Sequence, residues 1–430
     1  MRDILITVII LSAVPFILAK THIGILVWTW LSLMNPHRLA FGFAYSFPFA
    51  AVVSGAILIS LILSREPKRI PLNTVTVLLA LFILWMNITT IFAISHDLAL
   101  MEWSRTMKIL LMVLISMVVM QKRERIHAFT WSIVLSLGFY GLKGGVFALL
   151  SGGTYRVWGP AGSFIEDNNA LALAIIMTMP LMRYLQLHTE NKWIRRGLVV
   201  LMVASFLSAI ASYSRGALLA LAAMGLVFWF KSQKKLLVGL SVVSIALPLL
   251  MFMPEQWMSR MNTIETYHQD ASAMGRINAW WFAYNVAKDR FLGGGFGTSN
   301  PSLFRIYAPD PQDFHAAHSI YFEILGEHGF VGLGLFLAVM VFAWRTGTRI
   351  IKIAKNQPEL KWAESLAAMS QVSLIAYAVG GAFLSLAYFD LYYNLVALMV
   401  LTEQVIKLKI IESTHPQENL LRKRSKNLTQ

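Results

Sequence analysis

The chain has 430 residues, of which 57% are hydrophobic and only 14% are charged, whereas charged residues make up about a quarter of an ordinary soluble chain. Apolar runs of membrane-span length recur along most of it, so the sequence predicts an all-α, polytopic transmembrane helical bundle and excludes a soluble fold or a β-barrel. The absence of cysteine excludes disulfides and thiol chemistry, and the net charge of +15 lies in short clusters between spans, a pattern typical of membrane topology and not of nucleic-acid binding.

The first two apolar runs, residues 4–19 and 23–34, are short for a bilayer whose hydrocarbon core needs about 20 helical residues. No small-residue cleavage site follows the first run, so we expect an uncleaved span and not a removed signal peptide. The pair could form a tight hairpin, or one of the two could insert only partly. We expect about 12 spans, with 13 as the alternative, and the N-terminus is cytoplasmic only if one of the two runs fails to cross.

The remaining sequence completes a division into four parts: N-terminal spans in residues 1–252, a long loop in 253–325, C-terminal spans in 326–410 and a polar tail in 411–430. Basic connections, which alternate with poorly charged ones, lie at 64–69, 121–125, 189–196, 231–235 and 345–355, and the tail is basic too. Because cytoplasmic loops are enriched in Lys and Arg, this alternation predicts a bacterial inner-membrane protein with a cytoplasmic C-terminus and a periplasmic 253–325 loop.

Several basic residues break this pattern at the predicted outer face. Arg105, Lys108 and Lys143 lie near the outer ends of two spans, Arg156 lies in an outer loop, and Arg215 lies in a tight outer turn. Ionisable side chains in or beside hydrocarbon are costly and are functional candidates by default, although each one alone could extend to the lipid headgroups. Together on one side they predict a binding site for a large anion, and a lipid-linked diphosphate fits that requirement.

The acidic pair Glu166-Asp167 precedes the span that starts at Asn168. The pair could hold a divalent cation, but no DxD motif occurs in an outer loop, so we expect a metal-free mechanism. The alternative is that the two acids cap the N-terminus of the helix, where the backbone dipole favours negative charge.

The 253–325 loop is too long for a simple connection and is rich in aromatic residues, so we expect it to fold against the membrane domain. Residues 273–290 have the pattern of an amphipathic helix that carries Arg276 near its start. The glycine-rich run 293–297 could cradle a phosphate through backbone N–H groups, but it matches no phosphate-binding motif. A chain reversal after the helix is therefore the favoured interpretation.

His315 and His318 lie where we expect the next helix to start, three residues apart and so able to face one way. A zinc site would use both histidines with Glu323 or Glu327, but no recognised metalloenzyme spacing is present. A neutral imidazole at the membrane edge suits general-base catalysis because its pKa lies near the operating pH. A capping or interfacial role for these histidines is an equally good interpretation.

Four short motifs are Ser214-Arg215-Gly216, Gly275-Arg276 followed by Trp280, the glycine-rich run 293–297, and His318-Ser319-x-Tyr321 with Glu327-x-Gly329. Through them the chain resembles the O-antigen ligase/polymerase superfamily of bacterial envelope glycan enzymes, over nearly its whole length. The stretch from Trp28 to Arg38, with Phe41-Gly42-Phe43-Ala44-Tyr45, resembles one branch in particular. That branch is the O-glycosylation ligases found with exosortase A and exopolysaccharide systems.

The resemblance implies metal-independent, inverting glycan transfer from an undecaprenyl-diphosphate carrier to an acceptor at the periplasmic face, without a cofactor. Arg215 and Arg276 would hold the diphosphate leaving group, and His318 would take the proton from the acceptor. Arg260 matches a second loop arginine more loosely. We therefore expect the active centre at the seam between the 253–325 loop and the bilayer.

Two further site candidates follow from the same resemblance: Asp390, at an outer turn near the C-terminus, and Glu327 would orient or tune the site. The outer-face cations Arg105, Lys108 and Lys143, which the charge pattern indicates, would add positive charge toward the diphosphate.

Alternative functions share parts of this pattern. The acceptor could be a lipid, a protein or a growing polysaccharide, so a polymerase of the same superfamily is the nearest alternative, and only the branch resemblance favours a ligase. A flippase or exporter of lipid-linked glycan would need cations along a path through the midplane, whereas here they gather at the outer face. A scaffold subunit of an envelope export complex would leave Arg215, Arg276 and His318 dispensable.

Overall fold

The computed structural model describes residues 1–231, 236 and 271–414; residues 232–235, 237–270 and 415–430 lie outside its described part. Every regular element among the described residues is a helix, which confirms the all-α prediction. The first six long helices are α1 (Arg2–Ala19), α2 (Thr21–Met34), α3 (Phe49–Leu63), α4 (Thr74–Ile91), α5 (His96–Val119) and α6 (Arg123–Leu150). The others are α7 (Asn168–Leu187), α8 (Lys192–Ile210), α9 (Arg215–Lys231), α12 (Ala271–Asp289), α13 (Pro301–Tyr307), α14 (Ile320–Ala354), α15 (Lys361–Gly380) and α16 (Asp390–Thr414).

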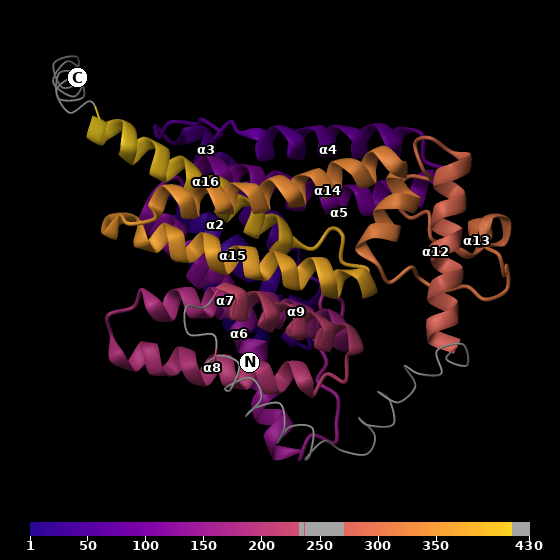
Figure 1. The fold of residues 1–430 in the computed structure, drawn as a ribbon, viewed down its shortest axis with the longest axis horizontal. Coiled ribbons are helices and arrows are strands. Elements are labelled where there is room, and N and C mark those ends of the chain that lie inside the picture. The colour runs from indigo at the N-terminus through magenta and orange to yellow at the C-terminus, as the bar shows by residue number, and fades with distance from the viewer. Residues whose placement is uncertain (232–235, 237–270, 415–430) are drawn as a thin grey trace.

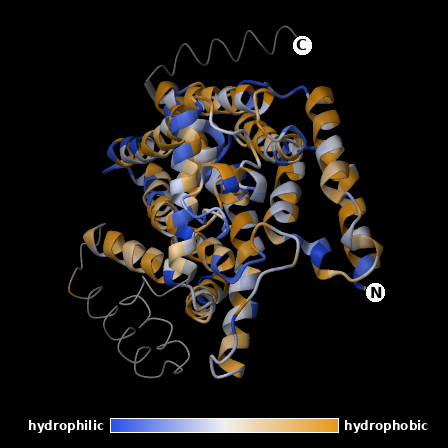
Figure 2. Ribbon diagram, turned by 90° about the vertical axis from the view of Figure 1, so that its right-hand side faces the viewer, coloured by the Kyte–Doolittle hydropathy of each residue, from blue (hydrophilic) through white to orange (hydrophobic). Residues whose placement is uncertain are grey.

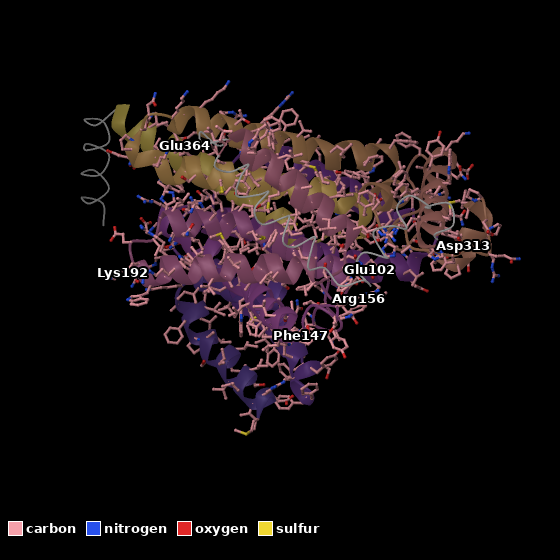
Figure 3. The ribbon with its side chains drawn as sticks, turned by 60° about the horizontal axis from the view of Figure 1, so that its bottom comes forward. Glu102, Phe147, Arg156, Lys192, Asp313 and Glu364 are labelled. Atoms are coloured by element: carbon pink, nitrogen blue, oxygen red, sulfur yellow. The ribbon has the colours of Figure 1, made fainter. Side chains whose placement is uncertain are left out.

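The long helices lie side by side in a bundle, and α12 and α13 lie across one end of it (Figure 1). We call this the α12 end, and we call the opposite end, which carries the connections 64–73, 120–122 and 188–191, the basic end. Glu102, Arg156 and Asp313 lie at the α12 end, whereas Lys192 and Glu364 lie at the basic end (Figure 3). The polar groups of the chain are thus divided between the two ends.

The sides of the bundle are apolar. Side chains such as Phe16 on α1, Leu84 on α4 and Val200 on α8 are more than half exposed, and a view onto the α12 end shows apolar residues over most of the helices (Figure 2). Seven described helices are long and apolar enough to cross a membrane, and the shorter apolar helices α2, α3 and α9 accompany them. The expected total of about 12 spans includes residues outside the described part and stays a prediction.

The two short N-terminal helices form a tight hairpin, the first of the two arrangements that the sequence allows. Lys20 alone separates α1 from α2, and at that turn the Thr21 hydroxyl lies 2.9 Å from the Ser60 hydroxyl at the end of α3. At the other end of α1, Asp3 Oδ1 accepts hydrogen bonds from the backbone N–H groups of Gly42 (2.9 Å) and Ala44 (3.2 Å). Both helices therefore pack along α3, and the N-terminus lies beside the connection at 35–48 that follows α2. In the predicted orientation, a hairpin that crosses the membrane twice predicts an N-terminus on the periplasmic side.

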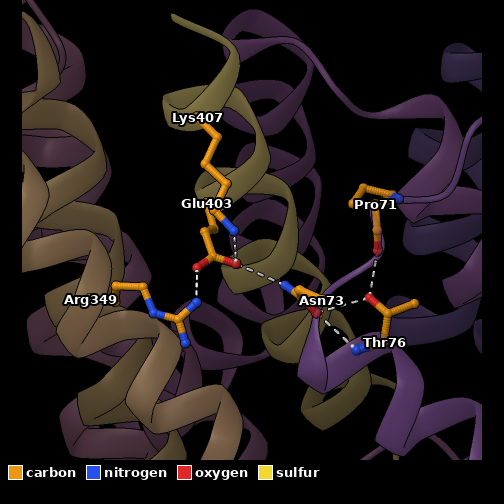
Figure 4. Close-up of polar contacts among 6 residues, drawn as sticks. All are labelled: Pro71, Asn73, Thr76, Arg349, Glu403 and Lys407. Carbon is orange, nitrogen blue, oxygen red and sulfur yellow. Dashed lines mark hydrogen bonds and ion pairs between the residues drawn. The ribbon is translucent and has the colours of Figure 1, made fainter. Parts of the chain in front are cut away.

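A buried carboxylate ties three helices together at the basic end. Glu403 on α16 is 2% exposed, pairs with Arg349 on α14, and lies 3.3 Å from Lys407 Nζ (Figure 4). Its Oε2 also accepts a 3.0 Å hydrogen bond from the side chain of Asn73, whose Oδ1 caps α4 by accepting from Thr76 N–H. A buried charge must be paired and hydrogen-bonded to be tolerated, so this cluster holds α4, α14 and α16 in register.

The helix α14 changes direction at Gly329, whose φ of 66° and ψ of −171° are non-helical. A Cβ at this position would lie 2.5 Å from the carbonyl oxygen of Phe291, so both the backbone conformation and the close approach require glycine. The kink divides α14 into a leading segment, residues 320–328, and a long segment, residues 330–354. The leading segment belongs to the α12 end, and the predicted span at 326–344 falls mostly in the long one.

The amphipathic helix predicted at 273–290 is confirmed as α12, within two residues at each end. It buries Ala279, Phe282 and Val286 in a small apolar core with residues of α13 and of the connection that leads to α14. The Phe282 ring stacks on Phe304 of α13 at a centroid distance of 4.9 Å. The described part of the predicted loop, 271–325, is therefore a folded layer, and it is placed to hold side chains over the end of the bundle.

We predict the orientation of the two ends from thiol labelling, because the native chain has no cysteine and gives no background. Ser302→Cys, on the exposed surface of α13, and Arg2→Cys, at the exposed start of α1, should both react with a membrane-impermeant maleimide from the periplasmic side. Lys192→Cys, exposed at the start of α8, is the matched control and should react only after permeabilisation. Labelling of Ser302→Cys from the cytoplasm alone would contradict the orientation, and the same result for Arg2→Cys would contradict the crossing hairpin.

Candidate functional site

The histidine motif precedes α14 and is not its first turn. The helix begins at Ile320, so the expectation that His315 and His318 start a helix is wrong. His318 has a φ of 42°, in the left-handed region that few non-glycine residues adopt. Such backbone strain is found preferentially at functional positions. The two imidazoles therefore do not share a helical face, and each has its own surroundings.

His315 rests on the backbone of α12. A Cβ on Gly275 would lie 2.5 Å from His315 Nδ1, so the glycine of the Gly275-Arg276 motif lets the ring approach. The same nitrogen lies 2.9 Å from Asp313 Oδ1. The motif thus fixes the connection that carries both histidines onto the first turns of α12, where Arg276 lies.

His318 lies in a charged and partly buried environment. Burial is the main cause that lowers its pKa below the ordinary 6.5, the Arg276 guanidinium lowers it further, and the Asp167 carboxylate opposes this by raising it. His318 is therefore neutral at pH 7, the state that a general base requires. The interaction also places residues from α12 and from the start of α7 around one imidazole.

Arg215 lies at the first position of α9, where an ordered turn directs it. The preceding Tyr213 has a φ of 59° and donates its hydroxyl hydrogen to the carbonyl of Gly153. Ser214 Oγ then accepts from Ala217 N–H at 3.1 Å, as an N-cap does. The tight outer turn that the sequence predicts is thus the N-terminus of α9, which Tyr213 and Ser214 stabilise through these hydrogen bonds.

The C-terminal end of α15 connects Arg215 with the histidine segment. A Cβ on Gly216 would lie 3.3 Å from Phe383 Cβ, just after α15, and a Cβ on Gly381 would lie 2.7 Å from Ile320 Cδ1. The hydroxyl of Tyr321 donates to the carbonyl of Ala378 at 2.7 Å. The starts of α9 and α14 therefore flank the same end of α15, which brings Arg215 and His318 to one region.

A cavity of about 710 Å³ lies at the α12 end beside this region. Three of the predicted residues line it: Arg105 and Lys108 on α5, and Asp390 at the start of α16. The Arg105 guanidinium carbon lies 3.6 Å from the centre of the Phe164 ring, three residues before Asp167. Arg38 and Glu102 also line the cavity and were not predicted as site residues, although Arg38 lies in the N-terminal motif from Trp28 to Arg38.

Two predicted residues are not brought to this cavity. Lys143 lines a separate pocket of about 250 Å³ together with Arg156, Tyr140 and Trp158. Arg260 lies outside the described residues. Among the described residues, the expected outer cations are thus divided: Lys143 and Arg156 line this pocket, and Arg105 and Lys108 line the cavity.

The glycine-rich run 293–297 is a chain reversal, as favoured, because its N–H groups are already used. Gly294 N–H donates to the carbonyl of Gly326 (2.9 Å), Gly295 N–H to the carbonyl of Glu327 (2.8 Å) and Gly297 N–H to Glu327 Oε1 (2.9 Å). Gly295 has a φ of 81°, which suits a residue without a side chain. The run therefore docks α12 and α13 onto the leading segment of α14 and does not cradle phosphate.

Glu327 and Glu323 hold the connection to α16. Glu327 Oε2 accepts a 2.5 Å hydrogen bond from the Tyr388 hydroxyl, and Glu323 Oε2 accepts a 3.1 Å bond from Ala387 N–H. His328 Nε2 lies 2.8 Å from the same Tyr388 oxygen. These carboxylates are engaged with the chain itself, so they are not placed as zinc ligands beside His318, and Glu327 holds Tyr388, which lies two residues before Asp390.

Of the acidic pair before α7, Asp167 has the capping role that was the alternative to metal binding, whereas Glu166 holds the turn before it. Asp167 Oδ1 accepts from Asn169 N–H at 2.8 Å at the N-terminus of α7. Glu166 Oε2 accepts from Gly162 N–H at 2.8 Å within the preceding turn. The two carboxylates therefore shape the connection that carries Phe164 to the cavity.

Comparison with protein families divides the chain into two matched regions. Residues 1–190 match a family of unknown function, DUF5935, and residues 200–337 match the O-antigen ligase family. No curated protein matches the chain. The second region contains Arg215, Arg276 and His318, and its match supports the O-antigen ligase superfamily and a glycan ligase or polymerase type of function. With its apolar helices, the chain is a multi-pass membrane protein.

We expect Glu327→Ala to destabilise the fold. The change removes the acceptor of the partly buried Gly297 N–H and the carboxylate acceptor of the buried Tyr388 hydroxyl, and a buried group left unpaired costs about 1–3 kcal/mol. Glu327→Gln keeps one acceptor oxygen and should cost less. The measurement is the thermal unfolding midpoint of purified protein in detergent. Glu359→Ala, which removes an exposed carboxylate that pairs with Lys409 at the basic end, is the control and should leave the midpoint nearly unchanged. Equal midpoints for Glu327→Ala and the wild type would contradict the positioning role.

Proposed function

We propose that the chain transfers a glycan from an undecaprenyl-diphosphate carrier to an acceptor at the periplasmic face of the bacterial inner membrane, without a metal ion. The observation that carries this proposal is the place of His318: it is partly buried at the polar end of an apolar bundle, and burial and the Arg276 charge lower its pKa. The match of residues 200–337 to the O-antigen ligase family supports it, because that region supplies both residues.

In the proposed reaction the acceptor hydroxyl or amide attacks the anomeric carbon of the donor sugar, and the His318 imidazole takes its proton. The bond between the anomeric carbon and the carrier phosphate breaks as the new bond forms on the opposite face, which inverts the configuration. The electron pair leaves with undecaprenyl diphosphate. A positioned base of this kind contributes about 10²–10⁴ in rate.

Arg276 and Arg215 are the proposed partners of the departing diphosphate. Negative charge develops on the leaving oxygen, and fixed cations in a water-poor site stabilise it, so that loss of one such group costs about 10²–10³ in rate. Arginine suits this role because its planar fork binds phosphate oxygens in pairs. The approach of α9 and α14 to the same end of α15 supports a shared role for the two arginines.

A ligase and a polymerase differ in the acceptor and not in this chemistry, and we favour a ligase on the resemblance of the stretch from Trp28 to Arg38 to the exosortase-associated branch. Transport of the lipid-linked glycan is less well supported. Arg105, Lys108 and Asp390 line a cavity at one end of the bundle, where they serve a reaction at the membrane surface.

We expect His318→Ala and Arg276→Ala to reduce glycan transfer by at least about 10²-fold while the protein still accumulates in the membrane. The assay uses purified full-length protein with undecaprenyl-diphosphate-linked glycan and an acceptor. Arg305→Ala, which removes an exposed charge on α13, is the control, and it should keep most of the activity. Transfer at wild-type rates by both test variants would refute the mechanism, and loss of transfer with a chelator would refute its metal independence.

The pH dependence of transfer provides a separate prediction. A base with a lowered pKa is neutral at pH 7, so kcat/KM should be flat near neutrality and fall only as the pH drops through the pKa of His318, below 6.5. Arg276→Gln removes a charge that lowers this pKa, so the acid limb of its residual activity should move to higher pH. Asp167→Asn should move it to lower pH. Arg305→Gln, on the exposed surface of α13, is the control. Identical acid limbs in all variants would show that His318 is not the titrating base.

A further inference from the structure

The cavity at the α12 end is formed almost entirely by the region that matches a family of unknown function. Its walls come from the end of α2 and the connection that follows, from the first half of α5, and from residues 162–164, all within 1–190, while Asp390 closes it from α16. Its volume of about 710 Å³ is in the range of small-molecule binding sites. The three residues proposed for the chemistry lie in the other matched region, and none of them lines the cavity. What the cavity could bind therefore depends on its own lining residues.

Buried polar groups without partners surround this cavity. Ser32 Oγ, His37 Nδ1 and Asp390 Oδ1 are buried and make no hydrogen bond within the described part of the chain, and all three residues line the cavity. Asp390 is only 5% exposed. Buried polar groups are almost always paired, and each unpaired one costs about 1–3 kcal/mol. Three at one cavity indicate a polar occupant that supplies several donors and acceptors.

The cations of the cavity are held by aromatic rings and not by carboxylates. The guanidinium carbon of Arg38 lies 4.6 Å from the centre of the Tyr45 ring, and that of Arg105 lies 3.6 Å from the centre of Phe164. In the part of the chain that the structure describes, neither arginine forms an ion pair within 4.0 Å, and the cavity carboxylates Glu102 and Asp390 form none either. Stacking covers the faces of a guanidinium and leaves its N–H edges available. The wall thus offers cationic donors and carboxyl acceptors at the same time.

This combination fits an acidic sugar better than a diphosphate alone. Glu102, Asp390 and His37 can accept hydrogen bonds from hydroxyl groups, which a diphosphate lacks, and Arg38 and Arg105 can bind a carboxylate or phosphate substituent. Trp28, on the same wall, offers an apolar face for the ring of a sugar. We propose that the cavity is the subsite for one acidic sugar residue of the substrate, so that residues 1–190 recognise the glycan while residues 200–337 carry out its transfer.

The cavity is joined to His318 through contacts already described. The connection that ends at Asp390 is held by Glu323 and Glu327, both in the leading segment of α14 that follows His318. Phe164 lies three residues before Asp167, whose charge acts on His318. A sugar bound between Arg38 and Asp390 is therefore held at a fixed position relative to the base. This proposal rests on the proposed glycan transfer, and it assigns Arg105 and Lys108 to the sugar side of the substrate.

The test measures KM and kcat separately for the donor and the acceptor with Arg38→Gln and Glu102→Gln. Each variant should raise the KM of one substrate by about 10-fold or more, because it removes a hydrogen bond to a charged group, and should leave kcat within about 2-fold. A raised KM for the lipid-linked donor assigns the subsite to the donor glycan, and a raised KM for the acceptor assigns it to the acceptor. Unchanged KM values, or a fall in kcat alone, would overturn the proposal.

Two controls separate a sugar subsite from a loss of folding. Arg196→Gln and Glu364→Gln make the same chemical changes at the basic end and should leave both KM values unaltered. All four variants should have wild-type unfolding midpoints in detergent. If the unfolding midpoint of Arg38→Gln falls, Arg38→Lys is used in its place. This variant keeps the positive charge but loses the planar guanidinium, so it should show a smaller rise in the same KM.

A binding measurement keeps this proposal distinct from the proposed function. Full-length protein in nanodiscs is titrated with methyl β-glucuronide and methyl β-glucoside, with saturation-transfer NMR as the readout, and the lipid-linked donor and the glycan acceptor are titrated in parallel by their retention on immobilised protein. If the wild type transfers no glycan, the proposed function fails. The subsite still stands if an acidic ligand binds more tightly than the glucoside and Arg38→Gln weakens its binding by about 10-fold or more. It fails if no acidic ligand binds, if the glucoside binds equally well, or if all variants bind equally.

Discussion

Two carboxylates on one short helical segment organise the end of the bundle where the polar residues meet. Glu327 accepts hydrogen bonds from Gly297 N–H and from the Tyr388 hydroxyl, and Glu323 accepts one from Ala387 N–H. Through these bonds α12 and the start of α16 are both fixed to the leading segment of α14. His318 precedes that segment and Asp390 follows Tyr388. The position of the cavity relative to the proposed base thus depends on the partly buried carboxylates of Glu323 and Glu327.

Features that depend on nearby residues could be predicted from the sequence, whereas features that join distant segments could not. The amphipathic pattern of residues 273–290 indicated α12, and a helix cap at Glu166-Asp167 was one of the two interpretations that the sequence allowed. The non-helical His318 was missed, although Ser319 is a common N-cap residue that signals a helix start at Ile320. The cavity was missed as a unit because Arg38, Glu102 and Asp390 are far apart in the chain, and no local spacing reveals that three segments converge. Lys143 illustrates the same limit, because the predicted membrane face of a cation does not show which pocket it lines.

The two family matches correspond to a physical division within one bundle. Residues 200–337 contribute charged groups at helix starts and in the layer across the α12 end, where they can act on a reacting bond. Residues 1–190 contribute a cavity whose arginines are stacked on aromatic rings and whose polar atoms lack partners. Preorganised donors of this kind lose little side-chain freedom when a ligand arrives, which favours selective binding.

The break in α14 at Gly329 has a mechanical consequence. An unbroken helix of 35 residues would transmit any change in tilt along its whole length. Bilayers differ in hydrocarbon thickness, and membrane helices adapt by tilting at a small energetic cost. Because residues 330–354 join residues 320–328 through a glycine outside the helical conformation, the long segment can tilt about this joint while the short one keeps its bonds to the glycine-rich run and to Tyr388. The interruption therefore separates the tilt of the long segment from the geometry of the proposed site.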